Sequence, residues 1–122
     1  MPGQPVNIEI PADDTTGARA FWSSLFGWQF QASQGQFEYD TARISDHSGA
    51  AITNMEPGKR GIRIYFDVDD IHAGAARVTE LGGTAGEPGP VPGMGWFAVC
   101  HDPAGNEFAL WQNDPAAPGP VY

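Results

Sequence analysis

Apolar and polar side chains alternate strictly over residues 5–10. The apolar positions are Val6, Ile8 and Ile10, and the polar positions between them are Asn7 and Glu9. Alternation with a period of two predicts a β-strand that buries one face. Beyond it, apolar positions recur at intervals of three and four, which predicts an amphipathic helix over about 15–26 with a buried stripe. The members of this stripe are Ala18, Phe21, Trp22 and Leu25. Asp13 or Asp14 would cap the helix, and Gly27 would end it.

The same arrangement returns 56 residues later without a gap, so that Ile62 corresponds to Val6. The second copy predicts a strand over 62–68 and a helix over about 70–82. Internal repetition of this kind predicts a chain built from two similar halves. A cleft between or within such halves is the expected place for a functional site.

Further strands give the predicted layout of strand, helix and three strands twice, except that one strand of the second set is obscured by the loop 83–95. They are expected at 28–32, 37–44, 50–55, 96–101 and 107–112. Turns are expected near 33–36 and 45–49, and the loop 83–95, rich in Gly and Pro, is either a lid or a wide connection. The expected divisions of this single domain are module one at about 5–56, module two at about 61–113 and a Pro-rich tail at 114–122.

One face of the predicted sheets collects polar and aromatic side chains, because residues two apart on a strand point the same way. Its predicted members are Asn7, Glu9, Arg63, Tyr65, Glu107 and Trp111, with Trp96 added from a strand whose two faces could both be buried. The helix-facing positions are expected to be Ile62, Ile64, Phe66, Phe108 and Leu110. A solvated sheet face has the same alternation, but aromatic residues favour a pocket or an interface.

Composition limits the possible partners. The chain has 122 residues, a formal net charge of −9 and one cysteine, Cys100. Such an acidic surface repels nucleic acid and anionic membranes and attracts cationic small molecules. One cysteine excludes an intramolecular disulfide. We find no secretory signal and no apolar run long enough to span a bilayer, so a cytoplasmic location is expected.

Several short motifs, in this order and spacing, resemble the vicinal oxygen chelate superfamily over nearly the whole chain. They are residues 9–14 (EIPADD), 20–22 with 26–28 (AFW and FGW), 66–71 (FDVDDI), 81–83 (LGG) and 102–108 (DPAGNEF). That group includes glyoxalase I, extradiol dioxygenases, fosfomycin-resistance enzymes and bleomycin-binding proteins. The resemblance implies an α+β fold of two tandem βαβββ modules, which form curved mixed sheets around a cleft with the helices on the outer face.

The resemblance also implies where a metal would bind, since each half of these enzymes supplies ligands from its first and last strands. The corresponding positions here are Asn7, Arg63, Ala109 and the segment 50–55. Arginine stays protonated and repels a dication, and a carboxamide is a poor ligand for a transition metal. We therefore expect no metal and no cofactor, although Glu9 and Glu107 could hold a divalent cation weakly.

Three functions are open on this basis. The leading one is a small-molecule-binding protein like the bleomycin-resistance branch, which sequesters a cationic or aromatic compound. Trp96, Trp111 and Tyr65 would stack on the ligand, Glu9 and Glu107 would take a positive group, and Arg63 would orient them or bind a polar oxygen. The alternatives are a metal-dependent lyase, isomerase or dioxygenase with non-standard ligands, and a homodimeric interaction module. The resemblance implies a homodimer in each case.

Overall fold

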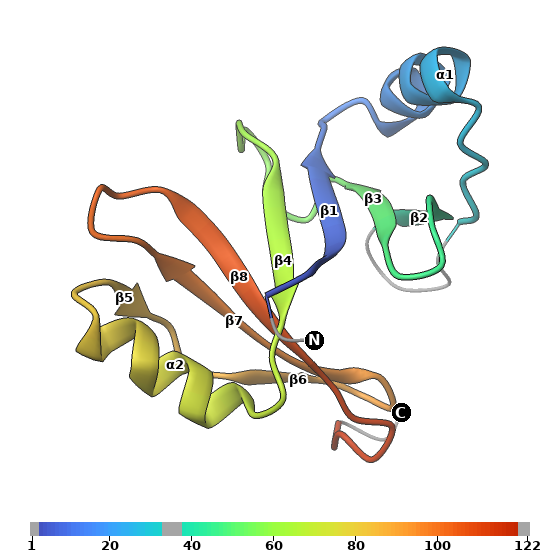
Figure 1. Cartoon of the computed structure of the whole chain (residues 1–122). Coiled ribbons are helices and arrows are strands. Elements are labelled where there is room, and N and C mark those ends of the chain that lie inside the picture. The colour runs from blue at the N-terminus through green and yellow to red at the C-terminus, as the bar shows by residue number, and fades with distance from the viewer. Residues whose placement is uncertain (1–2, 33–37, 120–122) are drawn as a thin grey trace. The chain divides into compact units, whose positions relative to one another are not determined.

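The computed structural model of the chain describes residues 3–32 and 38–119 (Figure 1). Within them the elements in chain order are β1 (Pro5–Pro11), α1 (Thr15–Phe26), β2 (Tyr39–Arg43), β3 (Gly49–Thr53), β4 (Arg63–Asp67), α2 (Ile71–Glu80), β5 (Thr84–Ala85), β6 (Gly89–Val91), β7 (Gly95–His101) and β8 (Glu107–Asn113). The strands pair in both parallel and antiparallel fashion, which confirms the predicted α+β fold with mixed sheets.

The chain divides into two compact units. Val6–Ile64 forms one, here called the N-terminal unit. The other, the C-terminal unit, begins at Tyr65 and includes the N-terminal residues up to Pro5. Each unit contains one helix that an aspartate caps.

In the N-terminal unit, β3 lies between β1 and β2. It pairs parallel with β1 and antiparallel with β2, with Ala51 opposite both Glu9 and Thr41. A carboxylate oxygen of Asp14 accepts a hydrogen bond from the Gly17 backbone N–H at 3.0 Å, which satisfies one of the free donors at the start of α1. The helix ends at Gly27, whose φ of 75° is readily available only to glycine. Both predicted ends of this helix are confirmed.

In the C-terminal unit, β8 lies between β4 and β7. It runs parallel to β4 and antiparallel to β7. The Asp70 side chain accepts hydrogen bonds from the backbone N–H groups of His72 and Ala73, so this residue caps α2. The core consists of Ile71, Ala98, Cys100 and Leu110. The loop predicted at 83–95 contains β5 and β6, which both pair with β7.

The apolar stripe of α1 is not buried as predicted. Phe21 is 60% exposed and Leu25 is 56% exposed. Trp22 stacks on Trp28 with 5.5 Å between ring centroids, and Phe26 packs on the same indole. The aromatic side chains of this helix thus contact one another and Trp28.

The prediction that Ile62 and Ile64 face a helix is wrong for both residues. Ile62 and Ile64 are 49% and 37% exposed, whereas Arg63 and Tyr65 are each 7% exposed. The reason is that polar partners compensate the burial of Arg63, as described below. Alternation identifies the two faces of this strand correctly but misassigns which face is covered.

The segment 28–32 is not a full strand. It contributes a single bridge between Gln31 and Thr41. The turn predicted near 33–36 and Phe37, the first residue of the strand predicted at 37–44, lie outside the described residues. No helix in the described part of the chain is long and apolar enough to cross a membrane.

Candidate functional site

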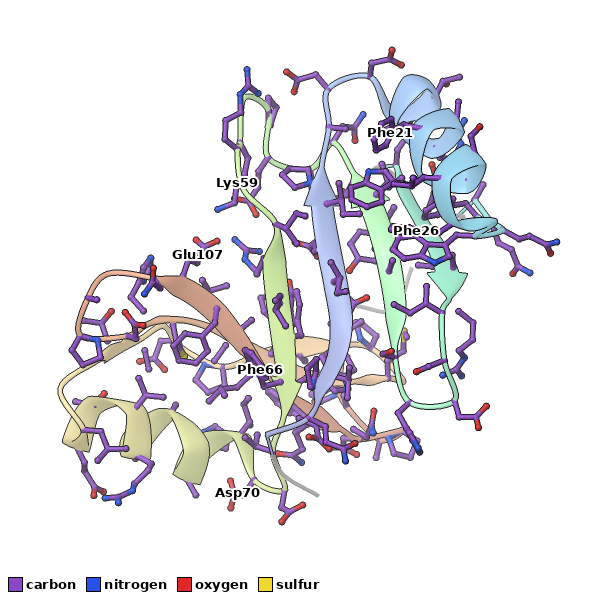
Figure 2. The ribbon with its side chains drawn as sticks, turned by 45° about the horizontal axis from the view of Figure 1, so that its top comes forward. Phe21, Phe26, Lys59, Phe66, Asp70 and Glu107 are labelled. Carbon is purple, nitrogen blue, oxygen red and sulfur yellow. The ribbon has the colours of Figure 1, made fainter. Side chains whose placement is uncertain are left out.

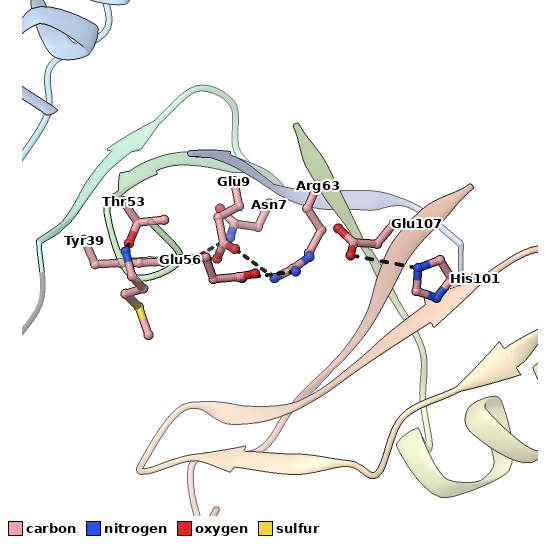
Figure 3. A network of polar contacts seen from close by, with 9 residues as sticks. Asn7, Glu9, Tyr39, Thr53, Glu56, Arg63, His101 and Glu107 are labelled. Carbon is pink, nitrogen blue, oxygen red and sulfur yellow. Dashed lines mark hydrogen bonds and ion pairs between the residues drawn. The ribbon is translucent and has the colours of Figure 1, made fainter. Parts of the chain in front are cut away.

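A buried polar network in the N-terminal unit brings together three predicted site residues (Figure 3). Arg63 Nη1 lies 3.1 Å from Glu9 Oε1, with the two side chains 8% and 12% exposed. The other carboxylate oxygen of Glu9 accepts a hydrogen bond of 2.8 Å from the Tyr39 hydroxyl. Asn7 Nδ2 donates to the same hydroxyl at 3.1 Å. A carboxylate removed from water in this way is stable only because a cation and a hydroxyl satisfy it.

The local structure explains this geometry. Asn7 and Glu9 are two residues apart on β1 and therefore point to the same face. Tyr39 is the first residue of β2. Its hydroxyl both donates and accepts, so it links the two β1 side chains. Sequence reasoning missed Tyr39, because nothing in the alternation of the chain predicts which side chain meets Glu9.

Glu56 forms the second ion pair of Arg63. Its Oε1 lies 3.1 Å from Arg63 Nη2, but its side chain is 51% exposed. Glu56 follows β3 in a turn in which the Lys59 N–H donates to the Glu56 carbonyl at 3.1 Å. The guanidinium of Arg63 is thus held between one buried and one half-exposed carboxylate. Sequence reasoning did not assign Glu56 to the site.

A second group of predicted residues lies on one face of the C-terminal unit. The β7–β8 register sets Phe97 opposite Trp111, Val99 opposite Ala109, and His101 opposite Glu107. The β4–β8 register sets Tyr65 beside Ala109. Facing pairs of adjacent strands share a side of the sheet. These residues therefore lie on the side opposite Leu110, which packs in the core with α2.

Trp111 is held in a defined position on that face. Its Nε1 donates to Asn113 Oδ1 at 2.8 Å. A Cβ atom added to Gly95 would come within 2.6 Å of the indole, so the ring lies directly over this glycine. At the other end of the face, His101 Nε2 and Glu107 Oε1 are 4.0 Å apart. The face therefore has aromatic rings at one end, small Ala109 in the middle and a carboxylate at the other end.

Trp96 does not belong to this face, so its predicted place beside Trp111 is wrong. It packs against the core cluster on the α2 side, with its ring 6.1 Å from that of His72. Its Nε1 donates to Asp114 Oδ2 at 3.0 Å. The physical reason is the register of β7, which turns Trp96 toward the helix and Phe97 toward the opposite face. Phe97 was missed because both faces of this strand have apolar side chains.

Two titratable groups in the C-terminal unit have shifted pKa values. Burial raises the pKa of the Cys100 thiol, and a weaker backbone hydrogen bond at Gly86 opposes this shift. Such a thiol is a packing residue and a poor nucleophile. Hydrogen bonds from the Asn106 side chain and backbone, together with Ala104, lower the pKa of Asp102. Asp102 thus fixes the turn between β7 and β8.

The positions at which the resemblance implies metal ligands have other roles here. Asn7 donates to Tyr39, and Arg63 pairs with two glutamates. Ala109 is fully buried and has no donor atom. Among the described residues, no three His, Cys, Asp or Glu side chains are grouped so that they could hold a metal ion. In this part of the chain the donor set does not fit the metal that the resemblance implies.

Comparison with known proteins agrees with this fold. The profile of the glyoxalase-like domain family matches residues 6–111. A glyoxylase-like domain-containing protein of Didymella fabae is 36% identical, and the match covers 88% of this chain and 92% of that protein. A solved structure of methylmalonyl-CoA epimerase from Mycobacterium tuberculosis superposes with a TM-score of 0.72 at 13% identity, over 93% of this chain and 89% of that one.

These matches define the class of protein: a member of the vicinal oxygen chelate superfamily. Within it, the chain belongs to the glyoxalase-like domain family. The anthracycline biosynthesis protein DnrV of Streptomyces peucetius is 30% identical over 91% of this chain. The match covers 47% of that protein, so the chain spans about half of its length.

Proposed function

We propose that this chain binds a small aromatic molecule, with or without a positive charge, and does so without a metal. The observation that carries the proposal is the ion pairing of Arg63 with Glu9 and Glu56 at a position where the resemblance implies a metal ligand. A dication beside this guanidinium would be repelled. It would also compete with Arg63 for the carboxylate of Glu9, which is already paired.

The proposed binding surface is the face of the C-terminal unit that carries Phe97, Trp111 and Glu107, here called the aromatic face. Phe97 and Trp111 stand side by side across β7 and β8 and offer two ring faces for stacking. Gly95 has no side chain, so the Trp111 ring can lie close over the sheet, and the small, buried Ala109 is the next residue along this face of β8. Glu107, two positions from Ala109 and four from Trp111, supplies a negative charge for an amine on the ligand.

The relatives suggest a probe. DnrV is named as an anthracycline biosynthesis protein. Anthracyclines are planar aromatic compounds, and daunorubicin also has a protonated amine, so it combines the two features that this face could recognise. The drug-binding branch that the sequence resembles sequesters cationic or aromatic compounds. We extend that role to this chain.

The test is a calorimetric titration of the protein with daunorubicin and with other planar aromatic amines. Trp111→Leu removes one stacking ring and should weaken binding by about tenfold, the equivalent of 1.4 kcal/mol. Trp28→Leu is the matched control, because it removes an indole from the N-terminal unit and should leave the affinity unchanged. Equal effects of both variants, or no binding of any compound in the panel, would contradict the proposal.

A further inference from the structure

Half of the positive charge of this acidic chain is concentrated in five residues. Lys59, Arg60 and Arg63 are three of its six basic residues, against fifteen acidic ones. They lie at the end of the turn between β3 and β4 and at the start of β4. Figure 2 shows Lys59 near the tip of this turn. In a chain with a formal charge of −9, three cationic side chains so close in sequence reduce the repulsion that a negatively charged group meets.

The two carboxylates on Arg63 differ in how easily they can be replaced. Glu9 is 12% exposed and is also held by the Tyr39 hydroxyl at 2.8 Å, so it is a fixed part of the fold. Glu56 is 51% exposed and reaches Arg63 Nη2 from the turn. A half-exposed ion pair contributes little net free energy, because water competes for both partners. The Nη2 side of the guanidinium is therefore the exchangeable one.

The turn can keep its backbone conformation when the Glu56 side chain moves. The Lys59 N–H donates to the backbone carbonyl of Glu56, and the Gly58 N–H donates to Asp13 Oδ1, each at 3.1 Å. Neither bond involves the Glu56 carboxylate. Gly58 has a φ of 76°, which suits it to this turn. Rotation of the Glu56 side chain therefore withdraws its carboxylate from Arg63 Nη2 without breaking either backbone bond.

We propose that Arg63 is an anchor for an oxyanion, the carboxylate or phosphate of a small molecule, and that Glu56 occupies this site when the ligand is absent. The ligand oxygen replaces Glu56 on Nη2, while Glu9 stays on Nη1 and keeps the guanidinium in place. Lys59 and Arg60 add positive charge beside the anchor. All residues named for this site lie in the N-terminal unit, and none of them belongs to the face of the C-terminal unit proposed above.

The test uses benzoate and phenyl phosphate as probes, and follows the side-chain N–H signals of the arginines by NMR. In Glu56→Gln the internal competitor loses its charge, and both probes should bind about fivefold more tightly than to the unchanged protein. Glu80→Gln is the matched control. It removes the same charge from another exposed pair, Arg77–Glu80, and should leave probe affinity within about twofold. The probe with the tighter binding identifies the ligand as a carboxylate or a phosphate.

A further variant separates this site from the aromatic face. Trp111→Leu should leave binding of both probes to the Arg63 site unchanged, whatever its effect on daunorubicin. Arg63→Lys keeps a positive charge but loses the planar fork, and should weaken both probes. The proposal is overturned if Glu56→Gln binds no more tightly than Glu80→Gln. It is also overturned if the probes move the Arg77 signals and leave those of Arg63 unmoved.

Discussion

The pair of Glu9 and Arg63 lies where the resemblance implies a metal ligand. Both side chains are almost fully buried, and each depends on the other for its charge. The free energy of such a pair is asymmetric: the intact pair contributes little net stability, but removal of one partner leaves an uncompensated buried charge. This asymmetry gives a direct test of the network.

Arg63→Met should lower the free energy of unfolding by about 3–5 kcal/mol, because Glu9 then stays buried without its cation. The double variant Arg63→Met/Glu9→Gln should recover most of this loss, since no charge remains to be compensated. Urea denaturation of the three proteins measures both effects. If the single and double variants are equally stable, the two side chains are not coupled as the structure shows.

Cys100 should make stability dependent on pH in the alkaline range. Its pKa in the folded protein is raised by burial, so as the pH rises the unfolded chain loses this proton first. The free energy of unfolding should therefore fall above about pH 9, near the ordinary thiol pKa. Urea denaturation between pH 7 and 10 measures this, and Cys100→Ala should reduce the slope. An identical slope in this variant would contradict the assignment.

The contacts of individual side chains also show what the sequence can predict. The shared face of Asn7 and Glu9 follows from alternation on β1 and is consistent with their common partner Tyr39. That partner could not be predicted, because it depends on the position of β2 next to β3. Trp96 was misplaced because β7 has apolar residues on both faces, so that alternation alone cannot tell which face meets a helix.

At the level of elements, the caps and the strand register position the site. Asp14 and Gly27 bound α1 as local chemistry predicts, since capping needs only residues near the helix ends. The covered face of β4 was predicted wrongly, because burial of Arg63 depends on glutamates from two other segments. On β8 the predicted alternation is correct, with Leu110 in the core and Ala109 on the opposite face.

The aromatic face depends on Gly95 in strand β7. A methyl group at this position would collide with the backbone oxygen of Gln112 and with the Trp111 ring. Gly95→Ala should therefore lower the free energy of unfolding by about 1–3 kcal/mol and shift the tryptophan emission. Gly89→Ala is the control, since its new methyl would meet Phe97 at an ordinary 3.5 Å. Equal stability of the two variants would show that Trp111 does not lie over Gly95.

The exposed apolar side chains of α1 bear on assembly of the whole molecule. Phe21, Leu25 and Phe26 are each more than half exposed, and adjacent apolar side chains of this size favour association. We propose a second copy of this chain as the partner, in line with the homodimers of the superfamily that the sequence resembles. Analytical ultracentrifugation at micromolar concentration should then show a dimer.

Leu25→Ser should weaken this dimer by about tenfold or more, because a buried leucine contributes about 1.5–3 kcal/mol. Leu81→Ser is the matched control, as Leu81 is the counterpart of Leu25 in the repeat and is 62% exposed. It should leave the dimer unchanged. A monomer at all concentrations, or equal weakening by both variants, would contradict the assignment of α1 to the interface.

The repeat and the order of short motifs predicted the family from sequence, because they record how the whole chain is organised. The site could not be predicted in the same way, since Glu9 comes from β1, Glu56 from the turn after β3 and Arg63 from β4. A single sequence shows that an arginine stands at an implied metal position. It does not show that two carboxylates already hold that arginine.

The most direct test of the central claim is the metal content of the protein. The protein is purified without chelator, dialysed against nickel, zinc, iron and manganese in turn, and examined by inductively coupled plasma mass spectrometry. Because Arg63 neutralises the carboxylates that a metal would need, we expect each metal to stay far below one ion per chain. A metal bound at one ion per chain, and lost when Glu9 is replaced by glutamine, would contradict the account.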